Sequence, residues 1–240
     1  MPVGRPDHSS HRSSQREGVI TGVEETAARL TWVRTEQSRF EQEALRDESL
    51  ADAYDAAAGS PAPPVDPAAG AALRFLAASI GARSVVEIGT GYGASGLWLL
   101  RGMARDGILT TMDSDAVHLD HTRALFARAG FGAGRARLIR GTAAEVLPRL
   151  TDGGYDLVFV DAERRSYPEF LDEALRLLRP GGMVVLHGVL AGPGGPDGPL
   201  RAPDPAETAA REVIGRIRED EAFISLLMPL GEGLLAAIRR

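Results

Sequence analysis

The chain has 240 residues, of which 44% are hydrophobic and 25% charged, and its formal net charge is −6. This length is enough for one α/β domain with a buried core, and the acidic balance argues against a nucleic-acid or membrane surface, because such surfaces usually need a basic patch. The sequence contains no cysteine and no lysine, which excludes disulfides, thiol nucleophiles, cysteine-ligated zinc, and Schiff-base or P-loop lysine chemistry.

The N-terminal region is polar and differs in composition from the rest. Residues 1–20 contain arginines but no apolar stretch of the kind a secretory signal needs, and we expect them to form a disordered tail. No apolar run reaches the ~18–20 residues of a membrane span, so we expect a cytoplasmic protein. Residues 21–58 have a helical pattern and precede a turn-rich break at 59–67. We interpret residues 21–240 as one domain, with 21–58 as a helical extension.

After this break and one amphipathic helix, strand-like and helix-like segments alternate. "RPGG" at 179–182 is expected to end a helix, and the Gly- and Pro-rich stretch 191–205 is a candidate lid. Alternation with nearly continuous apolar strands predicts a doubly wound α/β sheet, mostly parallel, with helices on both faces. The predicted strands are 84–88, 108–112, 136–139, 156–160, 183–187, 223–228 and 234–238, and the predicted helices are 93–104, 116–129, 142–150, 167–178 and 206–220.

The segment VVEIGTGYGASG, residues 85–96, leads from a strand through a glycine-rich turn into a helix. The glycines from Gly91 to Gly96 match the G-x-G-x-x-G pattern of dinucleotide-binding proteins. In that pattern the first glycine follows the strand almost at once, whereas here Gly89 is the first turn glycine and follows the acidic Glu87 closely. An acid at this place is unfavourable beside an anionic pyrophosphate. NAD therefore remains a weaker alternative.

A second acid follows at the end of the next predicted strand. Asp113, in "TTMDSD", lies about twenty residues after the turn, where a carboxylate accepts hydrogen bonds from the two hydroxyls of a ribose. A glycine turn with one acid below it and another at the next strand end suits an adenosine that carries a positively charged amino acid. We therefore expect S-adenosylmethionine (SAM) as the cofactor.

Several ordered motifs carry a resemblance to a known family. They are "VVEIGTGYGASGLWLL", "LTTMDSD", "ARAGF", "LIRGTAAEVLPRL", "YDLVFVDAERRSYPEF", "LRLLRPGGMVVLHGVLAGP" and "MPLGEGLLAAIRR". Over about residues 60–240 the chain resembles class I SAM-dependent methyltransferases, and specifically the bacterial catechol-type O-methyltransferases. The resemblance implies a Rossmann-like seven-stranded sheet with the last strand antiparallel, a small hydroxylated acceptor, and commonly a homodimer.

The resemblance also implies roles for individual residues. The methionine end of SAM falls on Glu87, Gly89, Gly91 and Ser95, the ribose on Asp113, the adenine beside Gly141, Thr142 and Ala143, and the reacting methyl near Asp161.

The sequence departs from the family at the metal site. Many members bind Mg²⁺ or Ca²⁺ through an Asp after the fourth strand and an Asp-Asn pair after the fifth; here Asp161 matches the first ligand, but His187-Gly188 replaces the pair, and the chain has no asparagine. One carboxylate is not a site for a hard cation, so we expect no divalent metal. A softer metal on Asp161, His187 and Glu163 is the alternative. In a metal-free site, His187 is a candidate base for the acceptor's proton, and Asp161 its neighbour.

Two functions remain open at this point. One is an O-methyltransferase acting on a small, aromatic hydroxyl compound; the other is a catalytically weak SAM-binding protein that acts as a sensor or partner subunit. Two further histidines, His118 and His121, lie three residues apart on one predicted helix, and we expect them on a solvent-facing side rather than at a metal. Tyr167 is expected in the core or at a dimer contact.

Overall fold

The structure, a computed structural model, describes residues 31–32, 35–61, 63–192 and 204–240. The predicted tail over 1–20 and most of the candidate lid at 191–205 lie outside the described residues. The chain divides into two compact units, Met1–Ala44 and Leu45–Arg240. In the first unit, residues 35–44 form a helix. The second unit contains the sheet and all its covering helices.

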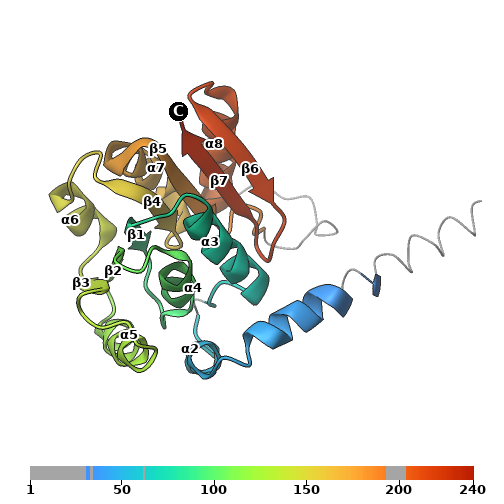
Figure 1. The fold of residues 1–240 in the computed structure, drawn as a ribbon. Coiled ribbons are helices and arrows are strands. Elements are labelled where there is room, and N and C mark those ends of the chain that lie inside the picture. Colours follow the sequence, from blue (N-terminus) through green and yellow to red (C-terminus); the bar gives the residue numbers. More distant parts are fainter. Residues whose placement is uncertain (1–30, 33–34, 62, 193–203) are drawn as a thin grey trace, which may run out of the picture. The chain divides into compact units, whose positions relative to one another are not determined.

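The second unit is built on a seven-stranded sheet (Figure 1). Its order is β3-β2-β1-β4-β5-β7-β6, and only β7 runs antiparallel to its neighbours. This confirms the predicted fold class and the antiparallel last strand. The strands are β1 (Ser84–Ile88), β2 (Ile108–Asp113), β3 (Ala136–Arg140), β4 (Tyr155–Val160), β5 (Leu178–His187), β6 (Phe223–Met228) and β7 (Leu234–Arg239).

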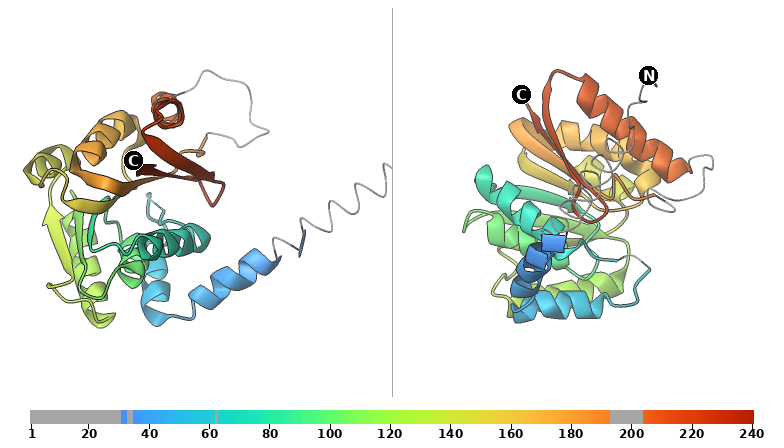
Figure 2. Two further views of the ribbon diagram at one scale, coloured as in Figure 1. Left: turned by 45° about the horizontal axis from the view of Figure 1, so that its top comes forward. Right: turned by 90° about the vertical axis from the view of Figure 1, so that its right-hand side faces the viewer.

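Helices cover both faces of this sheet. Figure 2 shows α3 and α4 on one face and α7 and α8 on the other. The central strands are therefore buried from both sides, which explains their continuous apolar runs; Val85, Val158 and Val184 are fully buried. The helices are α2 (Glu48–Ala56), α3 (Pro67–Ser79), α4 (Ala94–Gly102), α5 (Ala116–Arg128), α6 (Ala143–Val146), α7 (Tyr167–Leu177) and α8 (Pro205–Glu219). None of the described helices is long and apolar enough to span a bilayer.

Two element bounds differ from the prediction. The helix before "RPGG" ends at Leu177, as expected, but "RPGG" itself lies inside β5, which begins at Leu178 rather than at residue 183. Arg179 Nε donates to Asp156 Oδ1 at 2.6 Å, and this ion pair holds the segment against β4. The predicted helix over 142–150 is shorter, because α6 ends at Val146 and a 3₁₀ turn, Leu147–Arg149, follows.

Parallel strands bring their carboxyl ends to one edge of the sheet. β1 ends at Ile88, β2 at Asp113, β4 at Val160 and β5 at His187. The chain leaves β1 toward β2 on one side, while β4 pairs with β1 on the other. Such a reversal of strand order opens a crevice above the carboxyl ends, where ligands of α/β proteins bind.

Candidate functional site

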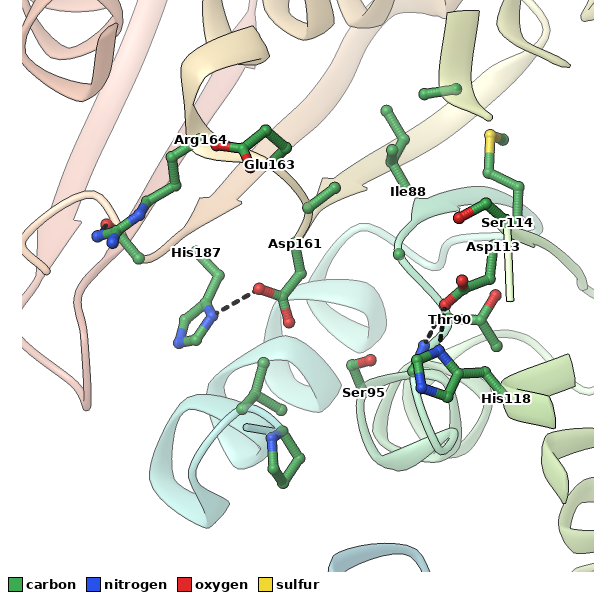
Figure 3. Close-up of a pocket in the computed structure, with 18 of the residues that line it drawn as sticks. Ile88, Thr90, Ser95, Asp113, Ser114, His118, Asp161, Glu163, Arg164 and His187 are labelled. Carbon is green, nitrogen blue, oxygen red and sulfur yellow. Dashed lines mark hydrogen bonds and ion pairs between the residues drawn. The ribbon is translucent and has the colours of Figure 1, made fainter. Parts of the chain in front are cut away.

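A cleft of about 800 Å³ opens at this edge. Its volume is that of a small-molecule site. Figure 3 shows Asp113 and His118 at one end and Asp161 and His187 at the other, with Ser95 between them. All the predicted cofactor residues except Glu87 line the cleft, together with His187: they are Gly89, Gly91, Ser95, Asp113, Gly141, Thr142, Ala143 and Asp161.

Two glycines of the turn after β1 have different functions. Both have positive φ, +97° at Gly89 and +49° at Gly91, which side chains disfavour. A Cβ on Gly89 would lie 2.0 Å from the backbone oxygen of Asp161, so this glycine lets β1 and β4 close on each other. A Cβ on Gly91 would meet no atom within 4 Å. Gly91 therefore faces open space in the cleft, where a ligand can approach its backbone.

Glu87 lies behind the cleft wall rather than in it. Its side chain is fully buried, and Ser95, which does line the cleft, donates its hydroxyl to Glu87 Oε1 at 2.6 Å. The second oxygen, Oε2, has no hydrogen-bond partner within the described part of the chain. Burial raises the pKa of Glu87 to about 7, against the partial lowering by hydrogen bonds with Ser95 and Thr111. The sheet thus holds an unsatisfied acid directly beneath the cleft.

Asp113 is held in place by three protein donors. Its Oδ2 accepts hydrogen bonds from the backbone N–H of Gly91 at 3.0 Å and lies 3.1 Å from His118 Nδ1, while Oδ1 accepts from the backbone of Asp115 at 2.9 Å. The carboxylate therefore connects the end of β2 with the glycine turn after β1.

The residues after β3 form a short capped turn. Thr142 donates its backbone N–H and its hydroxyl to Glu145 Oε2, both at 3.0 Å, which fixes the start of α6. Gly141, Thr142 and Ala143 face the same cleft as Asp113. The structure therefore places the predicted adenine and ribose residues at one end.

His187 and Asp161 form a pair at the other end. His187 Nδ1 lies 2.9 Å from Asp161 Oδ1. Only 6% of the His187 side chain is exposed, and its Nε2 has no hydrogen-bond partner among the residues described. Burial alone would lower the pKa of His187, but the hydrogen bond and negative charge of Asp161 outweigh it and raise the pKa above the usual 6.5. The carboxylate of Asp161 thus orients the ring, and Nε2 is the nitrogen without a partner among the described residues.

Two residues around this pair carry contacts that sequence patterns do not reveal. Tyr167 is 1% exposed, as expected of a core residue, but its hydroxyl donates to the backbone oxygen of His187 and also reaches the cleft. Arg164 Nη1 donates to the backbone oxygens of Gly188 at 3.3 Å and Ala191 at 2.8 Å. Tyr167 thus fixes the backbone at the end of β5, and Arg164 fixes the backbone that follows it.

The expectation of a solvent-facing side for His118 was wrong. Its side chain is 18% exposed, lines the cleft and contacts Asp113. The ring of Tyr92 meets the rings of His118 and His121 edge-on, with centroids 4.8 and 5.5 Å apart. The sequence signal that was missed is the position of His118 in the first turn of the helix after Asp113.

Known proteins resemble this chain along most of its length. The sequence profile of the O-methyltransferase family matches residues 36–240. A relative from Mycolicibacterium vanbaalenii that bears an O-methyltransferase name is 45% identical over 227 residues, covering 95% of this chain and 99% of its own. A relative from Mycolicibacterium smegmatis with a similar name is 52% identical over 73% of this chain and 82% of its own.

Comparison with solved structures also finds O-methyltransferases. A protein from Corynebacterium glutamicum has a TM-score of 0.77 at 30% identity, covering 86% of this chain and 96% of its own. The O-methyltransferase TomG from Streptomyces achromogenes, solved with SAM, has a TM-score of 0.69 at 28% identity, covering 85% and 98%. These matches confirm the resemblance drawn from the motifs, and the chain belongs to the O-methyltransferase family.

Proposed function

We propose that this protein transfers the methyl group of SAM to a hydroxyl of a small aromatic acceptor, with His187 as general base and without a divalent metal. The observation that carries the proposal is the orientation of His187. Its Nδ1 faces Asp161 at 2.9 Å, and its Nε2 is buried without a partner in the described residues.

Residues along the cleft support SAM as the ligand. The carboxylate of Asp113 suits the ribose hydroxyls, the open backbone of Gly91 leaves room for the ligand, and Ser95 with the buried Glu87 suits the positively charged methionine end. TomG and an O-methyltransferase from Bacillus cereus were solved with SAM and S-adenosylhomocysteine, respectively. When bound, SAM supplies a methyl group that its sulfonium already activates, so that positioning contributes much of the catalysis.

The residues at the acceptor end do not fit the metal of many family members. Hard cations bind several oxygen ligands, but Gly188 has no side chain, and His187 Nδ1 is occupied by Asp161. In the described ranges, no three His, Asp or Glu side chains gather closely enough to hold a metal ion. Arg164 donates hydrogen bonds to two backbone oxygens. The residues at the acceptor end therefore do not fit a metal-dependent step.

A bound metal ion would make the acceptor hydroxyl more acidic. Without a metal, a base can remove the proton of that hydroxyl instead. When His187 donates Nδ1–H to Asp161, its Nε2 has a free lone pair that can take the proton of an acceptor hydroxyl. Asp161 holds the ring in this tautomer and stabilises the imidazolium that forms. Phe170, Val65 and Pro64 line the same cleft and offer an apolar wall for an aromatic ring.

The second candidate is a SAM-binding protein with little catalytic power. Gly188, at a position where family members carry a metal ligand, is the observation that favours it. Titration calorimetry with SAM, S-adenosylhomocysteine and NAD tests the cofactor under both proposals. We expect SAM and S-adenosylhomocysteine to bind and NAD not to bind. Binding without turnover on any member of a phenol and catechol panel favours the second candidate.

The same panel tests the metal. We expect methyl transfer to continue unchanged in EDTA, because the described residues at the acceptor end do not offer the several oxygen ligands that a hard cation needs. Activity that disappears with EDTA and returns with Mg²⁺ or Ca²⁺ contradicts the metal-free mechanism. A control with EDTA and excess divalent ion added together excludes an effect of the chelator itself.

We also propose that the protein is a homodimer. β6 is an edge strand of the sheet, and Ile224, Leu226 and Leu227 on it are exposed. Exposed apolar groups on a strand edge are typical of a surface that pairs with another chain. Light scattering after size exclusion tests this, with Leu226→Lys as the variant expected to give monomers.

A further inference from the structure

The carboxylate of Asp113 is oriented before any ligand arrives. The backbone of Asp115 donates to Oδ1, and the backbone of Gly91 donates to Oδ2. Both of these donors are main-chain groups that any sequence could supply. The third contact, from His118 Nδ1 to Oδ2 at 3.1 Å, comes from a side chain and is therefore specific to this sequence.

The fold holds His118 itself in place. It lies in the first turn of α5 (Ala116–Arg128), which Asp115 caps through a hydrogen bond to the backbone of Val117. The ring of Tyr92 packs edge-on against it at 4.8 Å between centroids. Tyr92 directly follows Gly91 in the glycine turn. The ring of His118, on α5, therefore contacts both this turn, through Tyr92, and the carboxylate of Asp113.

We propose that His118 is a positioning residue for the cofactor: it holds Asp113 in the orientation that receives the two ribose hydroxyls. This inference rests on the proposed SAM site. Figure 3 shows His118 and Asp113 at the end of the cleft away from His187. A change at His118 therefore acts on the binding of the nucleoside and not on the proton transfer.

The strength of this hydrogen bond sets the size of the expected effect. When His118 donates its Nδ1–H, Oδ2 accepts two protein hydrogen bonds, and the carboxylate cannot rotate without losing one. Loss of a hydrogen bond to a charged group has a net effect of about tenfold on an equilibrium constant or somewhat more. Part of that loss appears as weaker ligand binding, because the free carboxylate samples orientations that the ribose does not fit.

The experiment is titration calorimetry with S-adenosylhomocysteine and SAM on the full chain. We expect His118→Ala to raise the Kd of both ligands about five- to tenfold. His118→Asn should restore most of the affinity, because its amide N–H stands close to the place of Nδ1. The matched control is His121→Ala, which also removes a ring from Tyr92 but leaves Asp113 untouched. It should change the Kd less than twofold.

Steady-state kinetics give a second readout where the protein is active. For His118→Ala we expect the KM for SAM to rise while kcat at saturating SAM stays within twofold. A fall in kcat at saturation overturns a role confined to positioning.

A double-mutant cycle separates positioning from direct contact, since His118 also lines the cleft. If His118 acts through Asp113, His118→Ala should have almost no effect in an Asp113→Ala background. A full loss in that background means that His118 touches the ligand itself, which overturns the inference. Equal affinity of His118→Ala and wild type overturns it as well. Failure of the wild type to bind SAM contradicts the proposed function instead, so the two failures are distinguishable.

Discussion

At the scale of single residues, Asp113 shows most directly how the cleft could select its ligand. If this carboxylate receives the ribose hydroxyls, Asp113→Ala should weaken SAM binding by about 1.5–3 kcal/mol, the usual range for hydrogen bonds to a charged group. That is about ten- to a hundredfold in Kd, measured by calorimetry. Asp120→Ala, which removes an exposed carboxylate of α5 paired with Arg123, is the control. Unchanged affinity in Asp113→Ala contradicts the cofactor assignment.

His187, the proposed general base, allows a test of the chemistry at the other end of the cleft. We expect His187→Ala to lower turnover about a hundredfold, the usual contribution of a general base, while SAM affinity stays nearly unchanged. The turnover of the wild type should rise with pH through a single ionisation, because only the neutral imidazole accepts a proton. Its midpoint should lie above pH 6.5, since Asp161 raises the pKa of His187. Full activity in His187→Ala contradicts the base assignment.

Asp161 gives an independent test of the same pair. Asp161→Asn removes the negative charge that raises the pKa of His187, while burial, which lowers it, remains. The midpoint of the pH–rate profile should therefore move to lower pH than in the wild type, and turnover should fall because the ring loses its anionic partner. A lower rate with an unmoved midpoint means that Asp161 acts on the reaction without acting through His187.

At the scale of elements, the two glycines of the turn between β1 and α4 are expected to differ in function: Gly91 in ligand binding and Gly89 in the packing of the strands. Gly91 faces open space and has positive φ, so Gly91→Val should abolish SAM binding by filling that space and by resisting the backbone conformation. Gly89→Ala should instead lower the melting temperature, because its Cβ would lie 2.0 Å from the backbone oxygen of Asp161. Normal SAM binding by Gly91→Val means that the turn is structural only. Thermal unfolding of both variants measures the difference in melting temperature.

The elements that the sequence predicts well are those with a local cause. The strands over 84–88 and 223–228 have the predicted bounds, because apolar runs and turn residues mark them directly. The start of β5 could not be predicted, since the pair of Arg179 with Asp156 joins residues 23 positions apart. The prediction that His118 faces solvent was wrong because its surroundings depend on how the helix packs. Helical spacing shows that it shares a face with His121, but not that this face turns to Tyr92 and Asp113.

At the scale of the whole molecule, Glu87 links the cleft to the stability of the fold. Its position near the end of an apolar strand could be predicted from the sequence, but its full burial depends on the neighbouring strands β2 and β4 and on α4. The energetic consequence is large. Raising the pKa of Glu87 from 4.5 to about 7 corresponds to about 3 kcal/mol of free energy of folding at pH above 7. Above that pH, the ionised acid beneath the cleft therefore destabilises the fold.

The sign of this linkage gives a testable pH dependence. Because the folded-state pKa is the higher one, the stabilising effect of protonated Glu87 is complete below pH 4.5 and is lost as the pH rises through about 7. Glu87→Gln cannot ionise, so its free energy of unfolding in urea should fall less than that of the wild type over this range. Glu145→Gln is the control of opposite sign, since the hydrogen bonds from Thr142 lower the pKa of exposed Glu145. Its effect should appear as the pH falls through the acidic range. Parallel stability curves for wild type and Glu87→Gln would show that Glu87 does not change its protonation over this range, and would contradict an unsatisfied acid beneath the cleft.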